Sequence, residues 1–268
     1  MLVSDLLAAL LQRFPAEDAE GWDHIGLSVG DPNAEITGVT CALDVTESNI
    51  AEAAEHGHNV LLTHHPLYIK APATFAPADA SRPQCSAALY TAARAGMSVI
   101  SLHTNLDRSI AARTMLPRLM GLEPYSSLEH ADNPSQTGLG ALCDCAETHL
   151  SMLAQAAARA FDSEPRVWGD PNANIKRVAF LGGSLGDFGE LAIANDADVI
   201  ICGEAGYHVA QDLAIRGLSV ILLGHDRSEE PFVNILTKEA ASAGVDPATI
   251  DMIKGRRQWW TVHEGERS

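Results

Sequence analysis

The stretch NVLLTHHPLYIK (59–70) combines a buried strand with two adjacent histidines. Val60–Leu62 is an uninterrupted apolar run, which is typical of a short strand inside a protein. The run leads to His64 and His65, and Pro66 then ends the strand because it cannot donate a backbone hydrogen bond. Neighbouring side chains on a strand point to opposite faces, so a continuous strand would place only one of the two imidazoles at any given site.

Similar apolar runs alternate with alanine-rich segments along most of the chain. The predicted strands cover residues 36–44, 59–65, 97–107, 177–183, 198–204 and 218–226, and the predicted helices cover residues 47–56, 85–95, 188–194 and 207–216. Alternating strands and helices of this kind predict an α/β fold with largely parallel sheets.

The order of these elements repeats along the chain. The two closest segments are AGMSVISLHTNLD (95–107) and RGLSVILLGHDRSE (216–229), each of which leads from an apolar run into histidine and carboxylate residues. Such a repeat predicts two similar α/β halves. We place the first at residues 1–120 and the second at residues 121–268, with the C-terminal segment able to pack back on the first half.

The composition of the chain limits its possible partners and its possible location in the cell. The chain has 268 residues with 35 Asp plus Glu against 18 Lys plus Arg, a net charge of −17 that argues against nucleic acid as a partner. An acidic Asp5 stands where a secretory signal would need positive charge, and no apolar run is long enough to span a membrane. Five irregularly spaced cysteines predict reduced thiols, so we expect a cytoplasmic protein.

Histidine and carboxylate residues gather where the predicted strands end. Ligand sites in parallel α/β sheets form beyond the carboxyl ends of the strands. Each of these residues alone is as well explained by ordinary hydrogen bonding, but their joint occurrence at three strand ends predicts a shared metal site between the two halves. The residues at the strand ends, with His208 following a fourth strand, are His64, His65, His103, Asp107, His208, His225 and Glu229.

The number of candidate ligands favours two metal ions. Imidazole and carboxylate suit divalent zinc, iron or manganese. A single structural zinc ion needs four ligands, whereas five ligands with two carboxylates suit two ions about 3.5–4 Å apart that share a carboxylate. The adjacent histidines would then serve one ion each. The five candidate ligands are His64, His65, Asp107, His225 and Glu229.

Six ordered motifs resemble those of the Nif-three-like dinuclear-metal proteins, often catalogued as GTP cyclohydrolase 1 type 2 homologues. The resemblance covers nearly the whole chain and departs from the family pattern only at His24, usually asparagine, and at Cys202, commonly threonine. The motifs are WDHIGLSVGD (22–31), ALDVT (42–46), THHPL (63–67), HTNLD (103–107), CGEAGYH (202–208) and GHDRSE (224–229).

The resemblance implies a toroidal homohexamer in which each subunit holds two metal ions. The family's metal ligands match the five candidates given above. On this basis we expect Glu229 to bridge the ions, with His65 and Asp107 on one ion and His64 and His225 on the other.

Such a site predicts a metal-dependent hydrolase that acts on a nucleotide or another phosphorylated small molecule. Ring opening of GTP and cleavage of a phosphoester both fit. His208, His103 and Glu204 are candidates for proton transfer or substrate contact, although structural hydrogen bonds would also explain them. The alternative is a non-enzymatic hexameric metal-binding scaffold or regulator.

Overall fold

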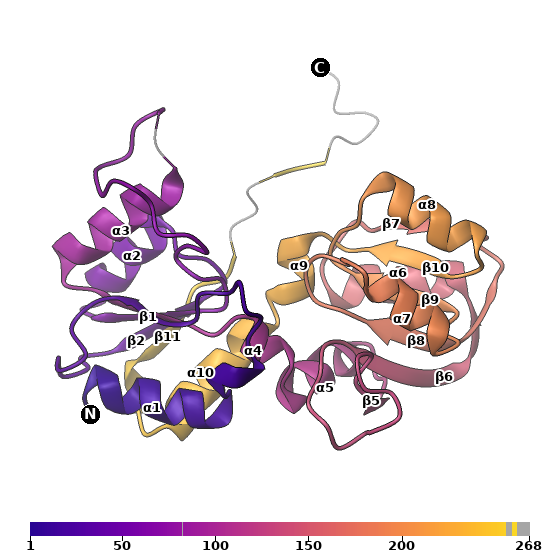
Figure 1. Cartoon of the computed structure of the whole chain (residues 1–268), viewed down its shortest axis with the longest axis horizontal. Helices are drawn as coiled ribbons and strands as arrows, with labels where there is room; N and C mark the ends of the chain where they lie inside the picture. The colour runs from indigo at the N-terminus through magenta and orange to yellow at the C-terminus, as the bar shows by residue number, and fades with distance from the viewer. Residues whose placement is uncertain (82, 256–258, 262–268) are drawn as a thin grey trace.

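The computed structural model describes residues 1–81, 83–255 and 259–261, which form two α/β units side by side (Figure 1). The first sheet has the strand order β1-β4-β3-β2-β11, and all neighbours are parallel except β1 and β4. Its strands are β1 (Gly26–Val29), β2 (Val39–Ala42), β3 (Val60–Thr63), β4 (Ser98–Ser101) and β11 (Ile250–Met252).

Helices cover both faces of this sheet (Figure 1). One face carries α2 (Glu47–Glu55) and α3 (Gln84–Ala95), and the other carries α1 (Val3–Arg13) and α10 (Phe232–Ser242). The chain therefore returns to the first sheet through α10 and β11 after it has completed the second.

The second sheet has the strand order β5-β6-β8-β9-β10-β7. Its centre, β8-β9-β10, is parallel, whereas β5, β6 and β7 pair antiparallel. Helices α7 (Phe188–Ala194) and α8 (Tyr207–Ile215) cover one face, and α6 (Leu150–Ala160) lies on the other. The strands are β5 (Pro124–Ser126), β6 (Ala141–His149), β7 (Arg166–Trp168), β8 (Asn174–Phe180), β9 (Val199–Cys202) and β10 (Ser219–Leu222).

The predicted α/β fold with two similar halves is confirmed. The segments β2-α2-β3-α3-β4 and β8-α7-β9-α8-β10 share one topology, and an antiparallel strand pairs with the last strand of each. Each last strand leads into a short helix: α4 (Thr104–Asp107) follows β4 and α9 (His225–Glu229) follows β10. Helix α5 (Ile110–Leu119) then packs against the second sheet. Short 3-10 turns occupy Ala16–Asp18 and Pro247–Thr249.

A hydrophobic core continues from one sheet to the other. In β3, Leu61 points to the side of α2 and α3, while Val60 and Leu62 point to the opposite side. The same core contains Phe180 of the second sheet and Phe232 of α10, so apolar packing joins the two sheets directly. No helix among the described residues is long and apolar enough to cross a membrane.

Leu62 tests the importance of this core, because its side chain is fully buried two residues before His64. Leu62→Ala should lower the free energy of unfolding by about 2–5 kcal/mol, through lost apolar contact and the cavity left behind. Urea denaturation followed by circular dichroism measures the change. The control Met152→Ala, at a side chain that is 55% exposed, should leave the midpoint almost unchanged; equal midpoints for both variants would contradict the prediction.

Candidate metal centre

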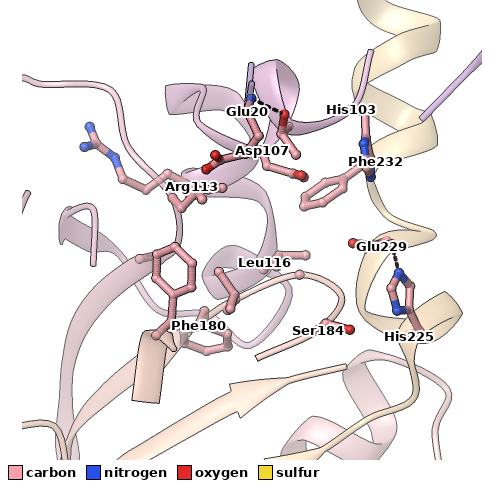
Figure 2. A pocket seen from close by; sticks show the side chains of 18 of the residues that line it. Glu20, His103, Asp107, Arg113, Leu116, Phe180, Ser184, His225, Glu229 and Phe232 are labelled. Atoms are coloured by element: carbon pink, nitrogen blue, oxygen red, sulfur yellow. Dashed lines mark hydrogen bonds and ion pairs between the residues drawn. The ribbon is translucent and has the colours of Figure 1, made fainter. Parts of the chain in front are cut away.

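The ends of β3, β4 and β10 bring six predicted site residues together between the two sheets. His64 and His65 follow β3, His103 precedes α4, and Asp107 is the last residue of that helix. His225 and Glu229 are the first and last residues of α9. Figure 2 shows Asp107, His103, Glu229 and His225 around one side of a shared pocket.

Glu229 lies at the centre of this cluster. Its side chain is buried, and its Oε2 lies 2.8 Å from Nε2 of His65 and 3.0 Å from Nε2 of His225. The other oxygen, Oε1, lies 3.8 Å from Nε2 of His64. Gly183 makes room for the carboxylate: it has a left-handed φ of +63°, and a side chain there would collide with Glu229. One carboxylate thus faces three imidazoles.

The two histidines that follow β3 are each fixed by a hydrogen bond at Nδ1. Nδ1 of the buried His64 donates to the carbonyl oxygen of Leu102 at 3.0 Å. Nδ1 of His65 donates to Oδ1 of Asp44 at 2.7 Å. These bonds occupy Nδ1 and direct each Nε2 at the cluster, so that an Nε2 without a proton would face a metal ion with its lone pair, the arrangement usual for metal-binding histidines.

His225 and His103 are held in the same way by carboxylates. Nδ1 of His225 lies 3.0 Å from Oε1 of Glu204, and Nδ1 of His103 lies 2.8 Å from Oδ1 of Asp23. All four imidazoles of the cluster therefore have an acceptor at Nδ1. Such partners fix the orientation of a ring and raise its basicity as a ligand.

The charges of the cluster are strongly coupled. Burial lowers the pKa of His65, but hydrogen bonds to Asp44 and Glu229 outweigh it and raise the pKa to about 10. The hydrogen bond to Glu229 raises the pKa of His225 to about 9. Burial works against ionised Glu229, yet its imidazole partners hold its pKa well below the usual range. In this arrangement Glu229 is a carboxylate that needs positive charge beside it.

One oxygen of Asp107 and one ring nitrogen of His64 have no hydrogen-bond partner among the described residues. Nε2 of His64 and Oδ1 of Asp107 are buried 3.5 Å apart, and neither forms a hydrogen bond with any residue that the structure describes. Burial raises the pKa of Asp107 to about 6. A buried polar atom without a partner costs about 1–3 kcal/mol, so a cation that both atoms could bind would relieve it. The side chains present therefore fit a divalent metal ion.

The distances group the ligands differently from the expected pairing. Nitrogen and oxygen atoms of His65, His225 and Glu229 lie within 4.8 Å of one another, and so do those of His64, Asp107 and Glu229. His65 is therefore grouped with His225, and Asp107 with His64, because Oε2 of Glu229 points at the first pair and Oε1 lies towards His64. Glu229 belongs to both groups, as a bridging carboxylate would.

The three residues predicted for proton transfer or substrate contact lie in different places. His103 belongs to the cluster, since one of its ring nitrogens lies within 4.8 Å of nitrogens of His64 and His65. Glu204 contacts Nδ1 of His225 and the hydroxyl of Ser184, which makes it a residue that orients His225. His208 is exposed on α8, and no contact among the described residues joins it to the cluster.

Sequence reasoning missed the roles of Asp23 and Asp44. Both lie in motifs that carry the family resemblance, WDHIGLSVGD and ALDVT, and Asp44 also ends a predicted strand. Their side chains hold His103 and His65, so the signal was an acidic residue within a motif and, for Asp44, its place at the end of a predicted strand.

A cavity of about 440 Å³ opens beside the cluster. The polar side is formed by His103, Asp107, His225 and Glu229, and the opposite wall is mainly apolar (Figure 2). A second hollow on the other side of the cluster is lined by Asp44, His65 and Glu204. The candidate ligands are thus reachable by a small molecule, a common feature of binding sites.

The described residues define a two-sheet α/β protein with a histidine and carboxylate cluster between its sheets. A family model described as Duf34/NIF3 (NGG1p interacting factor 3) matches residues 1–254. The chain belongs to this family, which confirms the resemblance seen in its motifs.

Relatives and solved structures agree with this assignment. A Clostridium perfringens protein called GTP cyclohydrolase 1 type 2 homolog is 30% identical over 86% of this chain and 88% of its own length. A Streptomyces coelicolor protein of the same name is 28% identical over 97% and 94%. The fold matches a Staphylococcus aureus hypothetical protein with a TM-score of 0.87, at 24% identity over 98% and 99% of the two chains. A Bacillus cereus protein related to NIF3 gives 0.85 at 19% identity, over 98% and 99%.

Metal binding should stabilise the folded protein, because the unfolded chain has no assembled cluster. Adding zinc, manganese or, without oxygen, ferrous ions should raise Tm by several degrees, and His65→Ala should remove most of this rise. Differential scanning fluorimetry measures it. The matched control His208→Ala alters an exposed histidine outside the cluster and should respond like wild type; an undiminished response of His65→Ala would contradict the assignment.

The hydrogen bond between Asp44 and His65 should contribute to metal affinity without any contact to the ion. Asp44→Asn should weaken binding about 10–100-fold, the usual effect of losing such a partner. Competition with a chromophoric chelator measures the affinity. Asp212→Asn, which alters an exposed carboxylate paired with Arg216, is the control. Equal affinities for the two variants would show that Asp44 has no such role.

Proposed function

We propose that the chain binds two divalent metal ions, of zinc, iron or manganese, and hydrolyses a small-molecule substrate. The observation that carries this proposal is the pair of buried, unpartnered atoms beside a carboxylate shared by two groups of ligands. One ion would be held by His64, Asp107 and Glu229, and the other by His65, His225 and Glu229.

The side chains around the cluster support hydrolysis. Two bound divalent ions would lower the pKa of a water molecule and stabilise negative charge on the attacked group. Asp44 and Glu204 keep the Nε2 atoms of His65 and His225 directed at the cluster. His103 lines the cavity and is held by Asp23, so it is the best-placed residue to move a proton to or from a substrate.

The substrate that we propose is a nucleotide or another phosphorylated small molecule. A cavity on the open side of the cluster supports an enzyme over a storage protein, whose ions would be enclosed by ligands. Relatives that cover most of this chain are named GTP cyclohydrolase 1 type 2 homolog. Ring opening of GTP and cleavage of a phosphoester are the two reactions to test first.

We further propose that the protein assembles as a homohexamer in the cytoplasm. Apolar side chains are exposed on the second unit, namely Tyr207, Val209 and Ile215 of α8 and Val167 of β7, and an assembly could cover them. The five cysteines are unpaired, as expected in a reducing compartment. A ring of this kind without turnover would serve instead as a metal-binding scaffold or regulator.

A substrate screen with a matched variant tests the hydrolase. Protein loaded with a defined metal is incubated with GTP, other nucleotides, phosphomonoesters and phosphodiesters, and products are measured by chromatography. Glu229→Gln should lower turnover by more than about 100-fold, since it removes the carboxylate that both ligand groups share.

The control for this screen is Glu190→Gln, which alters an exposed carboxylate on α7 and should keep wild-type turnover. Metal content is measured on the same samples. Full metal occupancy with no turnover of any substrate would rule out the proposed hydrolase and support the scaffold. No more than one ion per chain would rule out the two-ion site.

A further inference from the structure

Trp22 lines the cavity beside the cluster, yet 57% of its surface is exposed. It lies in the loop between the first 3-10 turn and β1, within the motif WDHIGLSVGD. Glu20 of the same loop also lines the cavity, and Figure 2 shows it with Asp107 and His103 along one side of the pocket. The indole therefore offers a flat apolar surface to a molecule that enters the cavity.

Four hydrogen bonds fasten this loop to the start of α4. The side chain of Asp23 is fully buried, and its Oδ1 accepts a hydrogen bond from Nδ1 of His103 at 2.8 Å. Its Oδ2 accepts from the backbone N–H of Thr104 at 3.0 Å and from the hydroxyl of Thr104 at 2.5 Å. The same hydroxyl accepts from the backbone N–H of Glu20 at 2.9 Å. Because the loop is already ordered on both sides of Trp22, a ligand that binds to the indole has little chain entropy to offset.

The indole lies directly beside the residue that is best placed to move a proton. The ring centroids of Trp22 and His103 are 6.0 Å apart, and the two planes are inclined by 75°, so the rings meet edge to face and are not stacked. A ring nitrogen of His103 lies in turn within 4.8 Å of ring nitrogens of His64 and His65. A planar group that stacks on Trp22 would therefore be separated from the cluster only by the width of His103.

We propose that Trp22 binds the aromatic base of a nucleotide substrate by stacking. The indole contacts the base, and the attacked group of the same molecule reaches the cluster beside His103. A cavity of about 440 Å³ is of the size usual for small-molecule sites. Stacking on an indole requires a ring, which a sugar phosphate lacks. Of the phosphorylated substrates considered above, Trp22 thus selects those with a base. The position of the attacked group rests on the proposed function, whereas the contact between base and indole does not require turnover.

Probes that differ in the presence of the base test this contact. GMP and AMP carry a purine, whereas ribose 5-phosphate has the same sugar and phosphate without one. Calorimetric titration of the metal-loaded protein should show that wild type binds the two nucleotides about tenfold more tightly than ribose 5-phosphate, the effect expected for a base stacked on an aromatic side chain. Trp22→Ala should remove this preference without changing the affinity for ribose 5-phosphate. Trp22→Phe keeps an aromatic ring and should retain most of the preference.

Trp260→Ala is the matched control, since it alters an exposed tryptophan that does not line the cavity. It should keep the wild-type preference, and the metal content of all variants should be equal. Equal binding of nucleotides and ribose 5-phosphate by wild type, no binding of any probe, or a preference that survives in Trp22→Ala would each overturn the proposal. Light scattering that shows a smaller assembly for Trp22→Ala would also overturn it, because the indole would then contact another subunit. The measurement needs no turnover, so failure of the proposed hydrolase leaves its result unaffected.

Discussion

The site depends on one buried carboxylate that contacts imidazoles from both units. Removing a carboxylate from water costs several kcal/mol unless nearby groups compensate. Glu229 is compensated by His65, which follows β3 of the first sheet, and by His225, which follows β10 of the second. The same interaction therefore neutralises the buried charge and fixes the ends of the two sheets relative to each other.

The four imidazoles gain their orientation from separate parts of the chain. Their partners at Nδ1 come from the loop before β1, the end of β2, the end of β4 and the end of β9, and they are Asp23, Asp44, Leu102 and Glu204. Each of these partners lies between 21 and 80 residues from its histidine in the sequence. Because a hydrogen bond fixes each ring, and three of the four partners follow strand ends, the Nε2 atoms need little reorganisation to bind a ligand.

Sequence reasoning predicted the strands and helices of the repeated segments, because apolar runs and alanine-rich helices give a strong local signal. It also predicted which residues meet at the cluster, because parallel strands share one carboxyl edge. It did not predict β5, β6 and β7, whose side chains are partly exposed and lack a clean alternation. The grouping of His65 with His225 depends on the rotamer of Glu229, and the exposure of His208 depends on where α8 begins. Neither the grouping of the ligands nor the exposure of His208 can be predicted from the local sequence pattern.

The return of the chain to the first sheet has a consequence for biosynthesis. Strand β11 pairs with β2, and α10 covers the face of that sheet opposite α2 and α3, yet both are made after the whole second unit. A nascent chain therefore leaves the ribosome with the edge of β2 open and part of an apolar face uncovered until about residue 252 has emerged. Exposed strand edges and apolar surface favour aggregation and chaperone binding. The first sheet is thus completed only after the second unit, α10 and β11 have been made, and the ligand set is complete only when both units are present.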